Sequence, residues 1–346
     1  MNKKLDILIL YVLLIFLIGI MNLYSASCNF SGNYIIRQVV WFFISLLVAT
    51  GVSFIGIRRI LSLGLVFYII SLLLLIVVLV LPAEGATHRW IKFGFLNIQP
   101  SQIMKFALPV FLVSVFYYSN FETTSSFMMP LFFTLFGVVL IAKEPDLGGS
   151  LMLIPSVITF FILKKAVFRK ALPWIIAALM IVPVVYLNLK PYQKSRILTF
   201  MNPELDPLGS GYTLMQSKIA VGSGNIVGKG WLNGAQGQLR FLPEAHTDFV
   251  FPVFAEEWGF LGVVVLLGLY LLMLKRMYNI ASRKKDGASG MLLNLFLVTI
   301  SVQIIVNIGM TIGIFPIVGL PLPFFSYGGS DLIVTVVMMA LFLRDE

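Results

Sequence analysis

The chain has 346 residues, of which 59% are hydrophobic and 12% charged, and its mean hydropathy is +0.97. Soluble domains carry about 25% charged residues, so this composition excludes a soluble globular protein and indicates an integral membrane protein. The net charge of +10 does not indicate nucleic-acid binding. Many of the cations stand in short connections beside apolar segments, where lipid phosphates are the natural anions.

Apolar segments recur along almost the whole chain. A helix needs roughly 17–25 apolar residues to cross about 30 Å of hydrocarbon. Ten membrane-spanning helices are predicted on this basis at residues 6–27, 38–56, 60–81, 101–119, 127–143, 147–163, 171–189, 249–274, 289–313 and 319–343. The expected fold class is all-α, a polytopic integral membrane protein whose residues 1–346 form a single membrane domain.

The basic residues assign an orientation to these spans. Lys3 and Lys4 precede the first apolar segment, which lacks an Ala-x-Ala cleavage site and is therefore expected to remain as a helix. These lysines, the pair at 58–59 and the basic clusters at 164–170 and 275–285 fall on one side of the ten-span arrangement. The positive-inside rule makes that side cytoplasmic, so both termini are predicted to be cytoplasmic.

One connection is much longer than the others. Residues 190–247, between the seventh and eighth predicted spans, contain many glycines and prolines together with dispersed aromatic and aliphatic residues. A loop of this length is usually functional or disordered, and its apolar content disfavours disorder. We expect a large structured extracytoplasmic loop that contains short helices.

Ionisable residues gather where this loop meets the eighth span. The stretch contains Glu244, His246, Asp248, Glu256 and Glu257. Charged groups beside lipid cost about 2.5–3.5 kcal/mol each at the bilayer centre, which makes such a group a candidate functional site. Asp248 also directly precedes an apolar helix, where a side-chain oxygen can cap the free amides. A catalytic role and a capping role therefore both remain open for Asp248.

Other polar segments are expected on the same side of the membrane. They lie at residues 88–94 with 99–105, at 143–150, at 192–230 and at 321–331. Polar groups that converge from separate spans are typical of a binding site.

The residues of these segments carry a resemblance to a known family. The sequence resembles the SEDS family (shape, elongation, division and sporulation), and Gln236 in Gly234-Ala-Gln-Gly favours its RodA-like elongation branch. The matching motifs include Arg89-Trp-Ile, Gln99-Pro-Ser with Lys105, Pro145-Asp-Leu-Gly, Arg196-Ile, Gly211-Tyr, Gln216-Ser, Gly228-Lys-Gly, Leu242-Pro-Glu-Ala-His-Thr-Asp-Phe, Glu256-Glu and Pro321-Leu-Pro-Phe-Phe-Ser-Tyr-Gly-Gly-Ser.

The resemblance implies a function. Members of this family are peptidoglycan glycosyltransferases that polymerise lipid II, anchored through undecaprenyl diphosphate, onto a growing glycan strand at the outer face of the bacterial cytoplasmic membrane. They work with a class B penicillin-binding transpeptidase. We therefore expect lipid II, the glycan strand, this transpeptidase and membrane lipid as partners, and no nucleic acid.

The resemblance also assigns roles to residues. Asp248 is the expected general base of an inverting transfer, and such a base typically contributes about 10²–10⁴ in rate. Glu244 is expected to assist as an orienting acid, with a solvated loop acid as the alternative. The residues expected to bind substrate or its diphosphate are Arg196, Lys218, Arg240, Arg89, Lys105, Gln216 and Ser217. Structural support is expected from His246, Thr247, Glu256, Glu257, Asp146, Ser326, Tyr327, Gly328, Gly329 and Ser330.

Metal binding has weak support in the sequence. The chain has no Asp-x-Asp pair, and His246 has no His or Cys neighbour at ligand spacing. Arginine and lysine are the simpler partners for a leaving diphosphate. We predict no metal ligands; no cofactor is certain, and a divalent cation stays a possibility.

The sequence departs from the family pattern at four positions. Gln102 stands where Glu usually follows Gln-Pro-Ser, so the ion pair expected between that acid and a lysine such as Lys105 is in question. Thr213, Ala235 and Asp331 stand where Gln, Thr and a second Ser are common.

Three alternatives to an elongation polymerase remain. A flippase or transporter of lipid-linked precursor would also place charges in a helical bundle. The acids gather at one rim instead of along a path through the membrane, which disfavours that reading. A division-branch (FtsW-like) polymerase and a non-catalytic scaffold for the transpeptidase are the other two, and the intact motif around Asp248 disfavours the scaffold.

Overall fold

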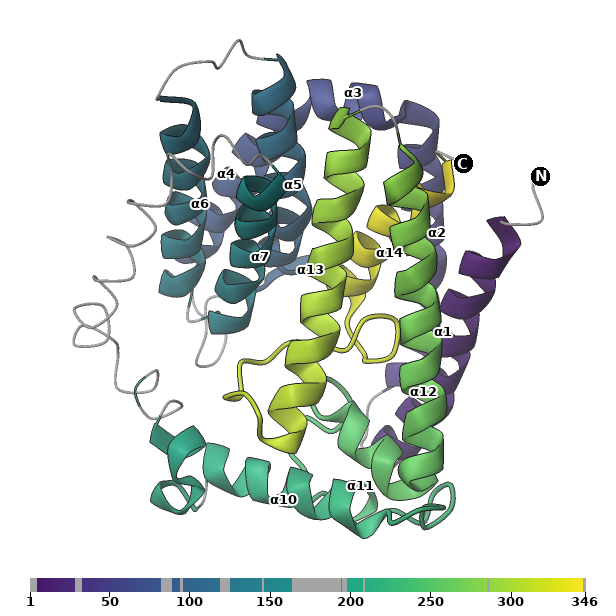
Figure 1. The fold of residues 1–346 in the computed structure, drawn as a ribbon. Coiled ribbons are helices and arrows are strands. Elements are labelled where there is room, and N and C mark those ends of the chain that lie inside the picture. Colours follow the sequence, from purple (N-terminus) through teal and green to yellow (C-terminus); the bar gives the residue numbers. More distant parts are fainter. Residues whose placement is uncertain are drawn as a thin grey trace. The chain divides into compact units, whose positions relative to one another are not determined.

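The described part of the chain is mostly helical (Figure 1). The computed structural model describes residues 5–28, 33–81, 89–93, 96–118, 125–144, 146–163, 194, 198–207, 209–284 and 287–344. Its helices are α1 (Leu5–Ser27), α2 (Tyr34–Ile55), α3 (Ile57–Ser62), α4 (Gly64–Val80), α5 (Pro100–Tyr118), α6 (Ser125–Lys143), α7 (Leu147–Leu163), the 3-10 helix η1 (Pro203–Leu205), α10 (Ser210–Ser223), α11 (Ala235–Gln238), α12 (Val250–Arg283), α13 (Gly287–Ile312) and α14 (Gly329–Arg344).

The predicted polytopic helical fold is confirmed. Among the described residues, five helices are long and apolar enough to cross a membrane, namely α1, α2, α5, α12 and α13, and α4, α6 and α7 contain shorter apolar helices. The predicted span at 171–189 lies outside the described residues. The described part of the 190–247 loop contains η1, α10 and α11.

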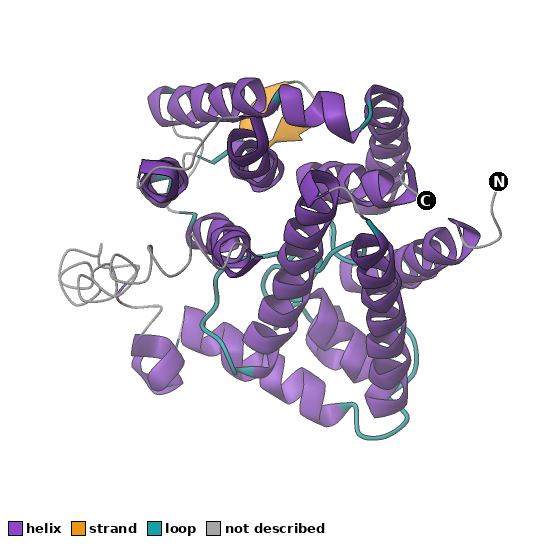
Figure 2. Cartoon of the chain, turned by 45° about the horizontal axis from the view of Figure 1, so that its top comes forward, coloured by secondary structure: helices purple, strands orange, loops and turns teal. Residues whose placement is uncertain are grey.

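The structure differs from the predicted elements in several details. The predicted span 60–81 is divided between α3 and α4, and α12 continues to Arg283, nine residues past the predicted 274. A short antiparallel hairpin, β1 (Ile91–Phe93) with β2 (Leu96–Ile98), is the only β structure in the described ranges (orange in Figure 2). The last helix begins at Gly329, ten residues later than the predicted 319. The preceding residues cannot continue a helix, because Pro321 and Pro323 lack amide donors and Gly319 and Phe324 have positive φ angles of 72° and 64°.

Helix α12 is interrupted near its start. Gly259 has φ 62° and ψ −165°, so Val250–Trp258 forms a short segment before the long apolar one. Residues 225–230 of the preceding loop complete the backbone hydrogen bonds that this break leaves open. The bonds run from Lys229 N to Glu256 O (3.0 Å), Gly230 N to Glu257 O (3.0 Å), Phe260 N to Asn225 O (2.9 Å) and Leu261 N to Ile226 O (3.0 Å). The loop is therefore part of the same hydrogen-bonded structure as α12.

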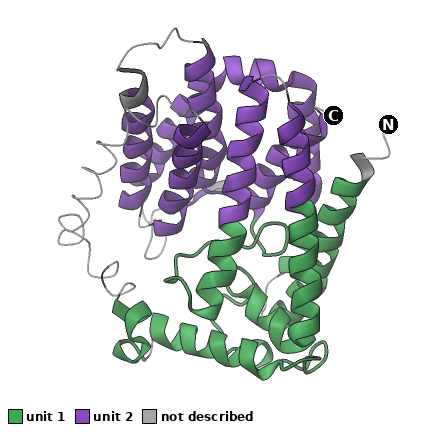
Figure 3. Cartoon of the chain, viewed as in Figure 1, with its two compact units in different colours: residues 1–40, 177–273, 303–328 green, residues 41–176, 274–302, 329–346 purple. Residues whose placement is uncertain are grey.

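The chain divides into two compact units (Figure 3). Unit 1 comprises residues 1–40, 177–273 and 303–328, and unit 2 comprises residues 41–176, 274–302 and 329–346. In unit 2, α5 packs against α3, α4, α6, α7 and α14, and its residues 104–113 are almost all buried. A helix that is buried and contacted on all sides forms the core of its unit.

Candidate active site

In unit 1, buried apolar residues before and after Asp248 hold the turn that carries it. Leu242, Ala245 and Phe249 are buried and pack with Ala26 of α1 and Val253 of α12. The intervening polar side chains point elsewhere: Glu244 is exposed, and His246, Thr247 and Asp248 are half-buried. The packing of these apolar residues thus fixes the backbone from which the side chains of Glu244, His246, Thr247 and Asp248 extend.

Local hydrogen bonds close this turn. Glu244 has a positive φ of 52°, and its carbonyl oxygen accepts the amide hydrogens of Thr247 (3.1 Å) and Phe249 (3.2 Å). The Thr247 hydroxyl donates to the Glu244 carboxylate at 3.1 Å. Helix α12 begins at Val250, two residues after Asp248.

The non-helical segment 313–328 lies against the same turn. A Cβ atom added to Gly319 would stand 3.2 Å from Oδ2 of Asp248, so this carboxylate lies beside glycine backbone. Asn307 of α13 joins the two segments, because its amide donates to Asp248 O at 3.1 Å and to Leu320 O at 2.6 Å. The Tyr327 amide donates to His246 O at 3.0 Å.

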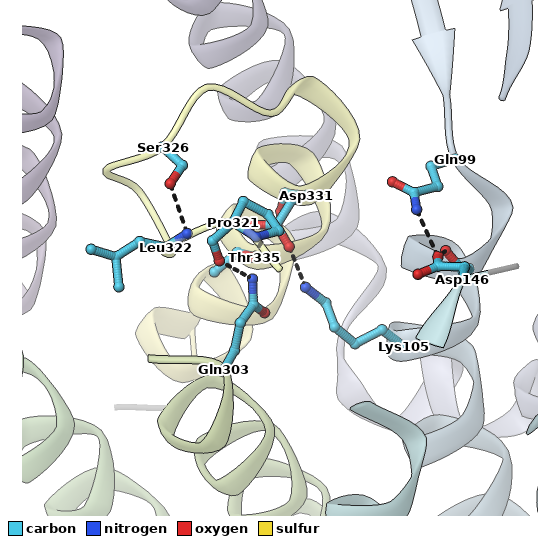
Figure 4. Close-up of polar contacts among 10 residues, drawn as sticks. Gln99, Lys105, Asp146, Gln303, Pro321, Leu322, Ser326, Asp331 and Thr335 are labelled. Carbon is cyan, nitrogen blue, oxygen red and sulfur yellow. Dashed lines mark hydrogen bonds and ion pairs between the residues drawn. The ribbon is translucent and has the colours of Figure 1, made fainter. Parts of the chain in front are cut away.

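The segment 313–328 is itself fixed by side-chain hydrogen bonds. Gln303 donates to Pro321 O at 2.9 Å, and the Leu322 amide donates to the Ser326 hydroxyl at 2.8 Å (Figure 4). Gln38 of α2 donates to Ser326 O at 3.0 Å and accepts from the Gly328 amide at 3.3 Å. These three side chains and Asn307 thus replace the regular hydrogen bonds of a helix, which allows a non-helical backbone beside apolar spans.

An aromatic cluster covers one side of the turn. The His246 ring stands 4.3 Å from that of Tyr34 and 6.3 Å from that of Tyr327, and the two tyrosines meet edge to face at 5.3 Å. Burial lowers the pKa of His246 below its usual 6.5, opposed by the charge of Glu244. Burial raises the pKa of Tyr327, opposed by a hydrogen bond and charge from Arg37.

Helix α10 contributes a cation near the end of α13. The Lys218 stem lies across Gly313, where an added Cβ would come within 2.2 Å of Cε. Gly313 has φ 82°, a conformation that favours glycine. Ser217, its neighbour, is fully buried and donates to Thr311 O at 2.5 Å. Gln216 is half-buried on the same helix.

The remaining predicted cations differ in their surroundings. Arg240 is exposed in unit 1 and has φ 59°. Arg196 lies outside the described residues. Arg89, in unit 2, is half-buried and donates from Nε to Glu144 O at 3.2 Å.

Glu256 and Glu257 are buried and hold neighbouring segments. The Glu256 carboxylate accepts hydrogen bonds from Lys229 Nζ at 2.6 Å and from the backbone amide of Gln236 at 3.1 Å. Glu257 accepts a short hydrogen bond from the hydroxyl of Ser25 in α1. The two acids therefore fasten the long loop and α1 to the first segment of α12.

A second polar cluster occupies unit 2. Asp146 accepts from Gln99 (2.8 Å), the Ser101 hydroxyl (2.7 Å) and the Gly149 amide (2.9 Å). The Ser330 hydroxyl accepts a hydrogen bond from the backbone amide of Gln99 at 3.1 Å and donates one to Asn97 O at 3.0 Å. These bonds join β2, α5, the start of α7 and the start of α14.

The unit 2 cluster contains a buried ion pair that the sequence left in question. Lys105 of α5 pairs with Asp331 of α14 at 2.5 Å, and their side chains are 3% and 6% exposed (Figure 4). Asp331 is one of the departures from the family pattern, and Gln102 is another. Gln102 is buried on α5, and its Oε1 has no hydrogen-bond partner among the described residues. The acid that pairs with Lys105 thus comes from α14 and not from α5.

Close packing surrounds two further residues of the unit 2 cluster. A Cβ atom at Gly329 would lie 2.2 Å from the Trp41 ring, so this glycine allows α14 to approach α2. Glu144 is fully buried, and neither carboxylate oxygen has a hydrogen-bond partner in the described ranges. Burial, followed by the charge of Asp146, raises the pKa of Glu144 to about 9, with Arg89 opposing.

Several residues of the site were not singled out from the sequence. Asn307 and Gln303 are polar residues inside an apolar span, which is a recognisable signal of a functional or packing role. Gln38 and Tyr34 gave no comparable signal, because they stand at the start of a span where polar and aromatic residues are common. For metal binding, the described residues contain no cluster of three or more His, Cys, Asp or Glu side chains.

Fold and site together define a polytopic membrane protein that presents a carboxylate on a rigid turn beside a spanning helix. Residues 5–345 match the family model of the FTSW_RODA_SPOVE cell cycle proteins, and the chain belongs to this family. It is 40% identical over 279 residues to peptidoglycan glycosyltransferase MrdB of Escherichia coli K12, covering 77% of this chain and 73% of the relative. It is 36% identical over 355 residues to a probable peptidoglycan glycosyltransferase FtsW of Wigglesworthia glossinidia brevipalpis, covering 98% and 92%.

Solved structures share the fold. A chain of a peptidoglycan synthase complex, described as coordinating polymerization and crosslinking, superposes with a TM-score of 0.83 at 34% identity and covers 97% of this chain and 96% of that chain. The rod shape determining protein RodA of Thermus thermophilus superposes with a TM-score of 0.71 at 32% identity, covering 97% and 94%. The resemblance seen in the sequence motifs is confirmed.

Proposed function

We propose that this peptidoglycan glycosyltransferase polymerises lipid II into glycan strands during cell elongation, at the outer face of the cytoplasmic membrane, with Asp248 as general base. The observation that carries the proposal is the placement of Asp248. Its carboxylate is half-buried beside Gly319, on a turn that Asn307 joins to the segment 313–328. A catalytic group needs such a fixed position, because a displacement of about 1 Å can cost roughly 10² in rate.

In the proposed reaction, Asp248 accepts the proton of the acceptor sugar hydroxyl. The hydroxyl oxygen forms a bond to the anomeric carbon of the donor as the bond from that carbon to the lipid diphosphate breaks. Attack from the face opposite the leaving group inverts the anomeric centre. Glu244, exposed and bonded to Thr247, is suited to orient the acceptor from the same turn.

The diphosphate leaves with negative charge that cations must stabilise. Lys218 is our first choice, because its stem is held against Gly313 while the residue remains exposed. Arg240, which is also exposed, and Arg196 complete the proposed set, with Gln216 in a supporting place. Lys105 and Ser217 are better suited to structural roles, since Lys105 pairs with Asp331 and Ser217 donates to Thr311 O.

In the proposed membrane orientation both termini lie in the cytoplasm, because the distribution of basic residues favours this side. Its proposed partner is a class B penicillin-binding transpeptidase. A structural relative belongs to a complex that coordinates polymerization with crosslinking, which supports this choice.

The test is polymerisation of labelled lipid II by the purified chain and by Asp248→Asn, which keeps the size of the side chain and removes its charge. We expect the variant to lose about 10²–10⁴ in rate, with an unchanged melting temperature. Glu244→Gln, which changes the proposed orienting acid on the same turn, should lose less rate and retain measurable polymerisation. Undiminished polymerisation by Asp248→Asn would refute the assignment of Asp248 as general base. A flippase would be favoured if the wild type made no polymer and Asp248→Asn still translocated lipid II in liposomes.

A further inference from the structure

Unit 2 contains a cavity beside α3, the short helix at the top of Figure 1. It has a volume of about 560 Å³ and collects side chains from the end of α2, from α3, from the α12–α13 connection and from the last turn of α14. Its lining residues are Phe54, Ile55, Gly56, Ile57, Arg58, Arg59, Lys284, Ser289 and Arg344. None of them belongs to the proposed catalytic site.

The cavity is strongly cationic. Arg58, Arg59, Lys284 and Arg344 contribute four positive charges, and no acidic side chain is among the described residues that line it. The three arginines are exposed and Lys284 is half-buried. Like charges from three separate segments repel each other, so their convergence favours an anionic ligand that compensates for the repulsion.

The backbone fixes where these cations stand. In α3, Ile57, Ile60 and Leu61 are buried, which turns Arg58 and Arg59 outward. Gly56 has φ 84°, and a Cβ atom there would stand 3.0 Å from a guanidinium nitrogen of Arg344. The Arg344 side chain therefore lies directly against the α2–α3 backbone.

Apolar side chains stand beside the charges. Phe54, next to the cavity's basic residues, is 84% exposed, and Ile55 is 39% exposed. A soluble anion would use only the cations. A lipid uses both kinds of surface, since its phosphate binds arginine while its acyl chains cover exposed aromatic and aliphatic groups.

We propose that this cavity binds the phosphate of an anionic phospholipid headgroup in the leaflet on its side of the membrane. Basic pockets between membrane helices are suited to anionic headgroups. The volume also lies within the range of about 300–1,000 Å³ that is usual for small-molecule sites. The site would tie α2, α3, α13 and α14 together at one membrane surface.

The experiment uses the purified, delipidated full chain in neutral detergent and native mass spectrometry with phosphatidylglycerol, phosphatidylethanolamine or inorganic phosphate. We expect bound phosphatidylglycerol, weaker phosphatidylethanolamine binding, and little competition from inorganic phosphate. Arg59→Gln/Arg344→Gln should weaken phosphatidylglycerol binding roughly tenfold or more, since each charge-assisted hydrogen bond contributes about that factor.

Two further variants separate the cavity from general surface charge. Arg283→Gln removes an exposed cation at the end of α12 that does not line the cavity, and it should leave binding unchanged. Arg344→Lys keeps the charge and should retain most of the binding, which distinguishes lost charge from lost folding. Equal loss in Arg283→Gln, or unchanged binding in the double variant, would overturn the proposal. Full competition by inorganic phosphate would overturn the lipid as its ligand.

Discussion

The buried Lys105–Asp331 pair predicts that the residues at positions 102 and 331, which both depart from the family pattern, affect the stability of the chain jointly. Asp331 replaces a common Ser, and Gln102 replaces a common Glu three residues before Lys105. Residues three apart share one face of a helix, so a Glu at 102 would lie within reach of Lys105 on α5. The structure instead supplies the acid from α14. We therefore expect one acid to be needed, from either position.

The magnitude follows from burial. With side chains 3% and 6% exposed, removing one partner leaves a buried charge without compensation, which costs about 3–5 kcal/mol. Asp331→Ser should thus lower the melting temperature by roughly 6–10 °C, taking about 2 °C per kcal/mol for a chain of this size. Asp331→Asn should show a similar loss, because it keeps the shape and removes the charge.

The decisive variant restores the family pattern. Gln102→Glu alone places a second acid beside one lysine and should destabilise the chain, whereas Gln102→Glu/Asp331→Ser should return to within about 1 kcal/mol of the wild type. The assay is thermal unfolding in detergent, followed by intrinsic fluorescence. Additive losses in the double variant, or an unchanged melting temperature in Asp331→Ser, would refute the reasoning.

Three other outcomes are expected. Burial raises the pKa of Glu144 to about 9 in the folded state, so the free energy of unfolding should decrease as the pH rises from 4.5 to 9. Glu144→Gln should therefore be more stable than the wild type at pH 8 but not at pH 5. The lowered pKa of His246 makes the unfolded chain bind more protons below pH 6.5, so the wild type should lose stability there relative to His246→Gln, and parallel melting curves would contradict this. Lys229→Met leaves Glu256 buried without its cation and should expose the loop to limited proteolysis, while Lys229→Arg should keep it protected.

The sequence predicted the helical class and most spans because hydropathy over some twenty residues is a strong signal. It missed the start of α14, since Leu320, Leu322, Phe324 and Phe325 are as apolar as a span but are buried in an irregular segment. Hydropathy does not distinguish burial in protein from burial in lipid. The prolines at 321 and 323 were the available warning.

At the candidate site, residue types were easier to predict than partners. The motif around Asp248 identified the turn, but its contact with Gly319 and Asn307 depends on segments about sixty to seventy residues away in sequence. The pairing of Lys105 with Asp331 was also not predicted, because the two residues are 226 positions apart in the chain. Such pairings are set by tertiary packing, which a single sequence does not encode in a readable pattern.

The hydrogen bonds between residues 225–230 and the break at Gly259 have a practical consequence for modifying the protein. Four backbone bonds fix the register of this segment against α12, so adding or deleting one residue there would misalign all of them. Residues 201–205, of which all but Pro203 are exposed, make no such bonds to α12 in the described part of the chain. Epitope tags, fluorescent labels and length variation should therefore be tolerated better at residues 201–205 than at residues 225–230.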